Sequence, residues 1–192
     1  MLTAEEKREL LRTARESIAS GFQGGRASSL PPHHEPSCGY AGALLNPGGA
    51  FVTLHLKGKL RGCIGHIESV DPVWRVVKDV AAKSAFHDPR FPPLRAEELK
   101  QIDVEISLLS PLAEIRDIGE IEVGVHGLLL ELGNHRGLLL PQVATEHGWT
   151  REEFLDHTAW KAGLKPEAWK DPRASIHIFT AEIIEESHVA AQ

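Results

Sequence analysis

Apolar residues near the amino terminus recur at the spacing of an α-helix. Four of them fall on one face of such a helix: Leu10, Leu11, Ala14 and Ile18. Thr3 and Glu6 have the spacing of a capping box, and Gly21 is a suitable place for the helix to end. The pattern predicts an amphipathic helix over about residues 4–20.

A β-hairpin is predicted next. The segments "AFVTLHL" and "LRGCIGHI" flank "KGK", where Gly58 can adopt the positive φ of a tight turn. Asp71 and Pro72 then start a helix whose apolar face is marked by four valines: Val73, Val76, Val77 and Val80. The prolines of "FHDPRFPPL" end it, because proline fits neither a helix interior nor a central strand.

The second half of the chain repeats this mixture of strands and helices. A short helix over 96–101 leads into the alternating strand "IDVEISLLS". "IEVGVH" predicts a further strand, and "GLLLEL" and "GLLLP" predict a hairpin around "GNHR". Pro141 opens a short helix, and Thr150 with Glu153 caps a longer one that ends near Ala162. "ASIHIFTAEII" predicts one last strand.

Hairpins and helices therefore come in blocks, without strict alternation of strand and helix. This order predicts an α+β fold with a mainly antiparallel sheet and flanking helices. The segments "KLRGCIG" and "HRGLLLP", 75 residues apart, each close a hairpin that precedes two predicted helices. The shared order suggests an internal duplication of a strand–strand–helix–helix unit.

Composition narrows the class of protein. A chain of 192 residues with 42% hydrophobic and 25% charged residues suits a single globular domain over 1–192, with a mobile loop over the Gly-, Pro- and Ser-rich stretch 21–40. The net charge of −6 disfavours a broad grip on nucleic acid. With two cysteines, a charge-rich first helix and no membrane-length apolar run, we expect a soluble cytoplasmic protein.

Cys63 in "LRGCIG" is the first candidate for chemistry. Arg61 and Cys63 lie two apart on the predicted strand, so their side chains project from the same side, about 6–7 Å apart. A guanidinium at that distance favours the reactive thiolate form of a cysteine in a cleft, and Gly62 and Gly65 would let a ligand approach the backbone. The alternative is a buried cysteine at a bulge or barrel corner, because free cysteine is often buried.

The hairpin turn decides which residues share a face with Cys63. A two-residue turn places it with Val52, Leu54 and Leu56, whereas a three-residue turn reverses that pairing.

The loop "HDPRF" is the second candidate. Asp88 and Arg90 lie in a proline-braced segment that could present charged groups to a ligand. They could equally cap a turn and form a surface ion pair. In the predicted loop over 21–40, His33, His34 and Cys38 are too loosely spaced to predict a metal site, so no metal is expected.

These motifs resemble those of the AMMECR-one domain family, whose prokaryotic members are called AmmeMemoRadiSam system protein A. "GAFVTLHLKGKLRGCIG", "AAKSAFHDPRFPPL", "EELKQIDVEISLLS", "GLLLPQV" and "FLDHTAWKAGL" occur in the family's order and cover about residues 5–185. The resemblance implies a curled, barrel-like sheet beside a smaller subregion, with a cleft near the "LRGCIG" signature. It also implies association with a Memo-type protein and a radical SAM protein.

Carried onto this chain, the resemblance marks the signature over residues 60–65, Asp88, Arg90 and Phe91 in the second block, and Lys161 in "KAGL". This chain departs from the family pattern at one position. Many bacterial members look to have a cysteine just before the lysine motif, where this chain has Ala159. A mechanism that needs two cysteines in the domain body is therefore doubtful here.

Two functions follow from these observations. In the first, a cleft at the signature binds a small molecule or a partner segment, with Cys63 and Arg61 as candidate catalytic residues. Gly62, Gly65, Asp88, Arg90 and Lys161 would then contact the ligand. In the second, the chain is a scaffold or regulatory interaction module, and the signature serves only the geometry of the sheet. Neither the cofactor nor the reaction can be read from the sequence.

Overall fold

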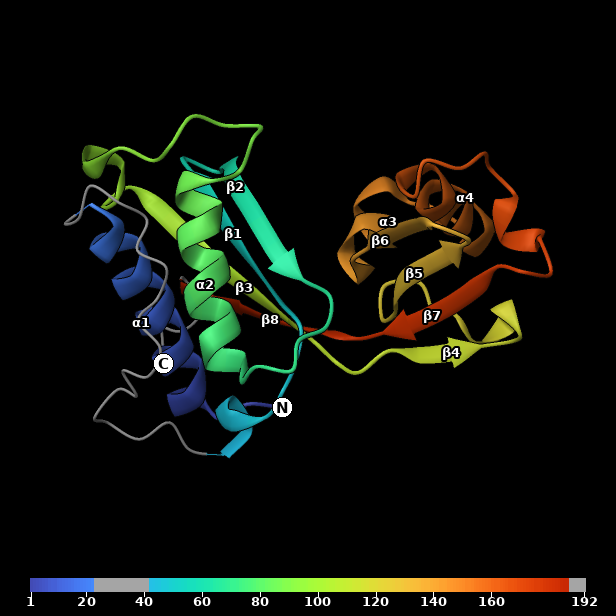
Figure 1. Ribbon diagram of the computed structural model, residues 1–192, viewed down its shortest axis with the longest axis horizontal. Coiled ribbons are helices and arrows are strands. Elements are labelled where there is room, and N and C mark those ends of the chain that lie inside the picture. The colour runs from blue at the N-terminus through green and yellow to red at the C-terminus, as the bar shows by residue number, and fades with distance from the viewer. Residues whose placement is uncertain (23–41, 187–192) are drawn as a thin grey trace. The chain divides into compact units, whose positions relative to one another are not determined.

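The structure is a computed structural model that describes residues 1–22 and 42–186 (Figure 1). Apart from its first two residues, the predicted loop over 21–40 lies outside the described residues, as do His33, His34 and Cys38. The chain divides into two compact units. The first comprises residues 1–108 with the chain from Glu182 onward, and the second comprises Leu109–Ala181.

A four-stranded sheet forms the framework of the first unit. Its strands, in spatial order, are β2 (Lys59–His66), β1 (Ala50–Leu56), β3 (Ile102–Leu109) and β8 (Ala181–Glu185). β1 pairs antiparallel with both β2 and β3. This strand order leaves β2 at one edge of the sheet.

Two helices pack on one face of this sheet, as Figure 1 shows for α2 in front of β1 and β2. They are α1 (Ala4–Gly21) and α2 (Val73–Phe86), and the unit also contains the short 3₁₀ helices η1 (Gly42–Leu45) and η2 (Ala96–Glu98). The predicted capping box of α1 is confirmed. The Thr3 hydroxyl accepts a hydrogen bond from the Glu6 backbone N–H, and the Glu6 carboxylate accepts one from the Thr3 backbone N–H. The apolar stripe of α1 and the valine face of α2 pack on Val52, Leu54, Val104 and Ile106 in one core.

The predicted hairpin is present, and β2 contains a bulge next to Gly62. Lys57 and Gly58 form a two-residue turn with φ of 53° and 73°. The register then shifts, so that Leu54 pairs with Gly62 rather than with Arg61. One extra residue reverses the faces of the rest of the strand. Cys63 therefore lies opposite Thr53. This is the face that was predicted for a three-residue turn, although the turn has two residues, and the face predicted for a two-residue turn, with Val52 and Leu54, is wrong.

The second unit contains its own sheet and core. Its strands, in spatial order, are β4 (Ala113–Ile115), β7 (Ser175–Phe179), β5 (Gly127–Leu132) and β6 (His135–Leu139). Its helices are α3 (Pro141–His147), α4 (Arg151–Lys161) and the short η3 (Ile118–Glu120) and η4 (Ala168–Lys170). Thr150 and Glu153 form the predicted capping box of α4. Phe154, Leu155 and Ala159 of α4 pack on Leu128 and Leu130 of β5.

Two predictions in this unit are wrong. "IEVGVH" is a turn, because Gly124 has φ of 89° and both Val125 and His126 donate backbone N–H groups to the Glu122 carbonyl. The predicted last strand is two strands, β7 and β8, that belong to different sheets. Thr180 separates them, and its backbone exchanges hydrogen bonds with Ser110.

The α+β class with mainly antiparallel pairing is confirmed. Each sheet runs between two different edge strands, so neither closes into a barrel, and the barrel-like description holds only loosely. The two sheets share one strand order. In each, the second strand of the hairpin is at an edge, the first strand is beside it, and the next strand of that sheet along the chain follows: β2-β1-β3 in the first unit and β6-β5-β7 in the second. This supports the suggested duplication, although the first hairpin is followed by one α-helix and the second by two.

Candidate functional site

The outer edge of β2 is held by two charged side chains of the loop that follows α2. Asp88 Oδ2 accepts a hydrogen bond from the Cys63 backbone N–H at 2.9 Å, and Arg90 Nη2 donates to the Cys63 carbonyl at 3.1 Å. An edge strand leaves such groups unpaired. Asp88 and Arg90 thus replace a neighbouring strand at the position of Cys63.

Asp88 and Arg90 are also paired with each other. Arg90 donates to Asp88 Oδ1 from Nε at 3.0 Å and to Oδ2 from Nη2 at 2.7 Å. Asp88 is only 4% exposed, whereas the Arg90 side chain is 54% exposed. The hydrogen bonds from Arg90 and from the Cys63 backbone keep the pKa of Asp88 well below its usual range, despite its burial.

Arg61 has hydrogen-bond partners other than Cys63. Its guanidinium forms an ion pair with Glu98, with Nε and Nη2 at 3.2 and 3.1 Å from the carboxylate oxygens. It also donates to the carbonyls of Pro92 and Pro93. Both side chains of the pair are nearly buried, and Arg61 holds the pKa of Glu98 below its ordinary value. Arg61 fastens the proline-rich loop to β2.

The two glycines of the signature are close to other groups of the protein. A Cβ on Gly62 would lie 2.2 Å from the Ser84 carbonyl oxygen of α2, so the helix backbone occupies that side. A Cβ on Gly65 would lie 2.3 Å from the ring of Phe51, its cross-strand neighbour. These contacts fill the space that the sequence had offered to a ligand.

Ser84 adds a polar link between α2 and the hairpin. Its hydroxyl donates to the Val52 carbonyl at 2.8 Å and accepts from the Ile64 N–H at 2.9 Å. Val52 and Ile64 are opposite each other in the hairpin, so the hydroxyl bridges the two strands. Ser84 was not among the residues singled out from the sequence, although it is the one hydroxyl-bearing residue on the otherwise apolar buried face of α2.

The Cys63 side chain projects from the sheet face opposite the helices. It is half-buried, and its sulfur accepts a hydrogen bond from the Thr53 hydroxyl at 3.4 Å. Arg90 supplies the nearby positive charge, because its Nη2 donates to the Cys63 carbonyl at 3.1 Å. Thr53 was missed as a neighbour of the thiol; only the bulge at Arg61 places it there.

The structure thus brings Cys63, Asp88 and Arg90 together and gives Arg61 other partners.

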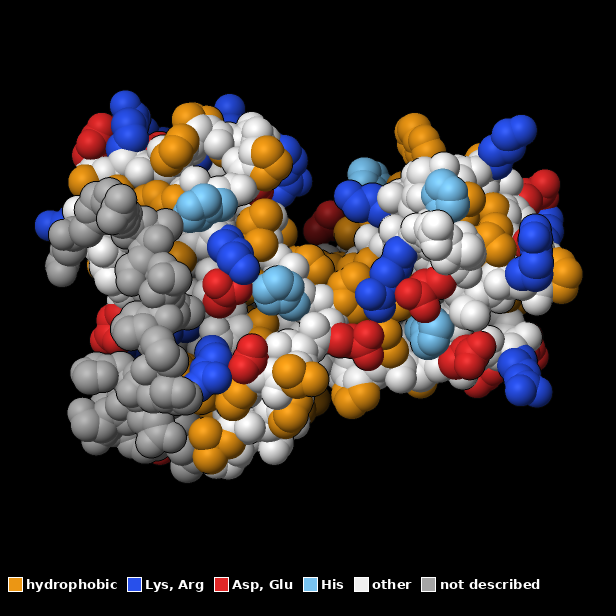
Figure 2. Space-filling model, in the orientation of Figure 1, with side chains coloured by type: hydrophobic (Ala, Val, Ile, Leu, Met, Phe, Trp, Pro, Cys, Tyr) orange, Lys and Arg blue, Asp and Glu red, His pale blue; other side chains and the backbone are white. Residues whose placement is uncertain are grey.

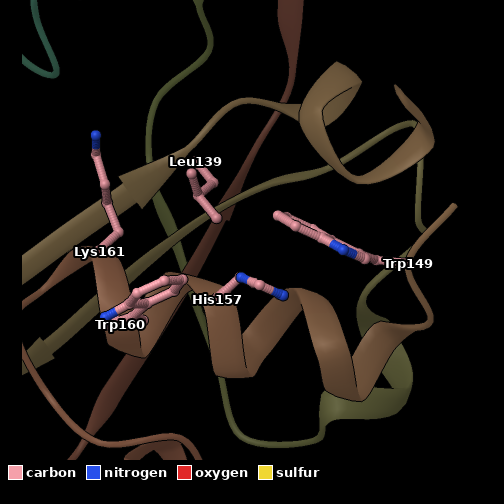
Figure 3. Close-up of a pocket in the computed structure, with 5 residues that line it drawn as sticks. All are labelled: Leu139, Trp149, His157, Trp160 and Lys161. Carbon is pink, nitrogen blue, oxygen red and sulfur yellow. The ribbon is translucent and has the colours of Figure 1, made fainter. Parts of the chain in front are cut away.

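Lys161 belongs to the second unit, where it lines a pocket of about 340 Å³ with Leu139, Trp149, His157 and Trp160 (Figure 3). In the described part of the chain, no group of three or more His, Cys, Asp or Glu residues is placed to hold a metal ion.

The described surface has neither a membrane-spanning helix nor, on the face seen in Figure 2, a broad basic patch. No helix within residues 1–22 and 42–186 has the length and apolar character to cross a membrane. On the face seen in Figure 2, acidic and basic side chains are interspersed over each unit. The described residues of this face therefore do not form an extended basic surface.

Comparisons with known proteins agree with the resemblance of the motifs. The AMMECR1 family model matches residues 11–184. A protein from Methanothermobacter thermautotrophicus is 43% identical over 191 residues, covering 96% of each chain. A protein from Thermococcus gammatolerans is 42% identical, covering 93% of this chain and 89% of its own.

A solved structure shows the same fold. The crystal structure of the uncharacterized protein PH0010 from Pyrococcus horikoshii superposes with a TM-score of 0.84 at 39% identity, and the match covers 96% of this chain and 93% of that one. The sequence motifs, the family model and this structure lead to the same assignment. The chain belongs to the AMMECR1 family.

Proposed function

We propose that this AMMECR1 domain binds a small molecule or a partner segment at Cys63, with the thiol in contact with the ligand and Arg90 binding an anionic group of it. The observation that carries this proposal is the half-buried thiol of Cys63, which lies beside the Thr53 hydroxyl on a residue whose carbonyl accepts a hydrogen bond from the Arg90 guanidinium. A thiol between a hydroxyl and a cation is a site where a polar ligand can be held or a reaction can occur.

The exposure of Arg90 supports its role. Its side chain stays 54% exposed while it holds Asp88 and the Cys63 carbonyl. Because Asp88 fixes the guanidinium, little conformational entropy is lost when an anion binds there. Arg61 is nearly buried against Glu98 and has no place in the proposed contact.

The partners proposed for this site are the Memo-type protein and the radical SAM protein that the family resemblance implies. The chain would work beside them in a modification pathway. The proposal concerns contact with these proteins at Cys63 and Arg90, and it assigns no reaction to the chain.

Binding experiments with purified proteins test this function. The tagged chain is incubated with the Memo-type and radical SAM proteins of the same organism, and retained partners are measured for wild type, Cys63→Ser and Arg90→Gln. We expect the wild type to retain a partner and both variants to lose most of it. Lys165→Gln, at an exposed lysine of the second unit, is the control. Equal retention by all four proteins would exclude Cys63 as the contact.

A scaffold function has specific support of its own. Gly62 gives space to α2, Asp88 pairs the edge of β2, and Arg61 fastens the loop after α2. All three contacts maintain the geometry of the sheet. If the signature is purely structural, Cys63→Ser retains every partner and Gly62→Val unfolds the protein.

A further inference from the structure

The pocket of the second unit is built from one face of α4 and the segments beside it. His157, Trp160 and Lys161 have the i, i+3, i+4 spacing that aligns side chains along a helix. Trp149 comes from the turn before α4, and Leu139 comes from the end of β6. Figure 3 shows Trp149 at one end, Trp160 and Lys161 at the other, and Leu139 and His157 between them.

One wall of the pocket consists of aromatic rings that stack on one another, which fixes their positions. The rings of Trp149 and His157 are 3.8 Å apart and nearly parallel, at 6°, and His147 stacks on the other side of the series at 4.7 Å from Trp149. The ring faces within this series cover one another, so the series forms a rigid wall. The exposed ring that remains for a planar ligand is that of Trp160.

Trp160 differs from the other rings. It is 69% exposed, and its ring is tilted by 48° to His157 at 6.0 Å. A large aromatic side chain left this exposed at the rim of a pocket is a typical binding residue, because a stacked ligand would cover it.

The charge of the pocket is positive. Lys161 is the charged residue among the five that line it, and none of the five carries a carboxylate. Glu153 lies about one helical turn before His157 on α4, and its carboxylate is held by the Thr150 backbone and hydroxyl. In a chain of net charge −6, a pocket lined in this way favours an anion.

We propose that this pocket binds a planar heteroaromatic anion of the size of a mononucleotide, with the ring stacked on Trp160 and the anionic group on Lys161. A volume of about 340 Å³ is near the lower end for small-molecule pockets, so one ring system with a short anionic arm fits better than a dinucleotide. Base–aromatic stacking is tolerant of base identity, so the ring class is assigned and a particular base is not. A single lysine is too little for nucleic acid, which needs several phosphate contacts.

Calorimetric titration of the full chain with adenosine 5′-monophosphate tests the proposal. We expect saturable binding that weakens about tenfold or more in Trp160→Ala, where stacking is lost, and roughly three- to tenfold in Lys161→Gln. Adenosine and ribose 5-phosphate each lack one half of the recognised ligand and should bind more weakly than the nucleotide. Lys165→Gln should bind as the wild type does, and so should Cys63→Ser, since this site does not rest on the function proposed for Cys63.

Three results would overturn the proposal. The first is the absence of saturable binding to wild-type protein. The second is unchanged affinity in Trp160→Ala, with the folded state verified by circular dichroism. The third is ribose 5-phosphate binding as tightly as the nucleotide, which would mean that only an anion is recognised. Unfolding of Lys161→Gln is measured in parallel, because a cation also stabilises the last turn of α4.

Discussion

At the scale of single residues, the chain contains one short motif in two settings. Asp88-Pro89-Arg90 and Asp171-Pro172-Arg173 both place a carboxylate where it accepts from the backbone and side chain of the arginine two residues later. Only Asp88 is buried, and only Asp88 also accepts from the Cys63 N–H. The same three residues therefore close a surface turn in one place and hold an edge strand in the other.

The first prediction concerns Asp88→Asn. The substitution removes the charge that faces Arg90 and replaces one of the two acceptor oxygens by an NH2 donor, so that a single oxygen remains to accept from the Cys63 N–H and from Arg90. We therefore expect a loss of about 2–3 kcal/mol in the free energy of unfolding at pH 7. Urea denaturation measures it. Asp171→Asn is the matched control and should have a clearly smaller effect, because its partner Arg173 is 80% exposed.

The same pair of variants predicts a pH dependence. The pKa of Asp88 is lowered in the folded state, so its contribution is fully present above the unfolded value of about 3.9. It is lost as the pH falls toward the folded-state value. The stability difference between wild type and Asp88→Asn should therefore shrink between pH 5 and pH 2, and a difference that grows on acidification would contradict this account.

At this scale the sequence identified the right candidates but paired them wrongly. Arg61 and Cys63 looked like partners because alternate residues of a strand share a face. In the structure the Arg61 guanidinium is held instead by Glu98 and by the carbonyls of Pro92 and Pro93. Arg90, 27 positions away in sequence, is the cation near the thiol. Only the folded path of the loop after α2 places it there.

At the scale of elements, the contact between α2 and β2 depends on a residue without a side chain. We expect Gly62→Ala to lower the free energy of unfolding by about 1–3 kcal/mol or more, because its Cβ would meet the backbone of α2 rather than a movable side chain. Gly133→Ala is the control, with open space around it and a positive φ, and should lose only about 1 kcal/mol. Equal losses in chemical denaturation would contradict the packing argument.

The serine bridge between α2 and the hairpin gives a further prediction. Ser84→Ala leaves the Ile64 N–H and the Val52 carbonyl without their shared partner, and we expect a loss of about 1–3 kcal/mol. Ser17→Ala, at a buried serine that donates to the Lys78 carbonyl, is the comparison. The thermal unfolding temperature should fall more in Ser84→Ala than in Ser17→Ala.

Local signals predicted most elements because their causes are local. Both capping boxes, the valine face of α2 and the Lys57–Gly58 turn depend on residues within a few positions of each other. β4 was missed because a strand of three residues leaves almost no pattern. The division of the last strand into β7 and β8 depends on two separate sheets, which no window of sequence can show.

At the scale of the molecule, the two units differ in how the chain builds them. The second unit is one continuous segment with its own core, inserted between β3 and β8 of the first. The first unit needs the chain that returns after it, because Ile184 is buried in its core and Glu186 pairs with Arg15. This difference in construction predicts that fragments of the two units differ in their ability to fold alone.

We expect residues 109–181 to fold alone and residues 1–108 to fail. A continuous segment with a complete sheet contains all of its core contacts, whereas the first unit without β8 exposes an unpaired strand edge. Nuclear magnetic resonance spectra of the two fragments check this. A dispersed amide spectrum from 1–108, or a collapsed one from 109–181, would contradict the division.

The account rests most on an accessible Cys63 thiol beside Arg90, and the rate of thiol alkylation measures this directly. In a Cys38→Ser background, iodoacetamide should modify Cys63 of the native protein at neutral pH without prior unfolding, and the rate should fall in Arg90→Gln. Modification only as fast as the protein unfolds, with the same rate in Arg90→Gln, would contradict the account.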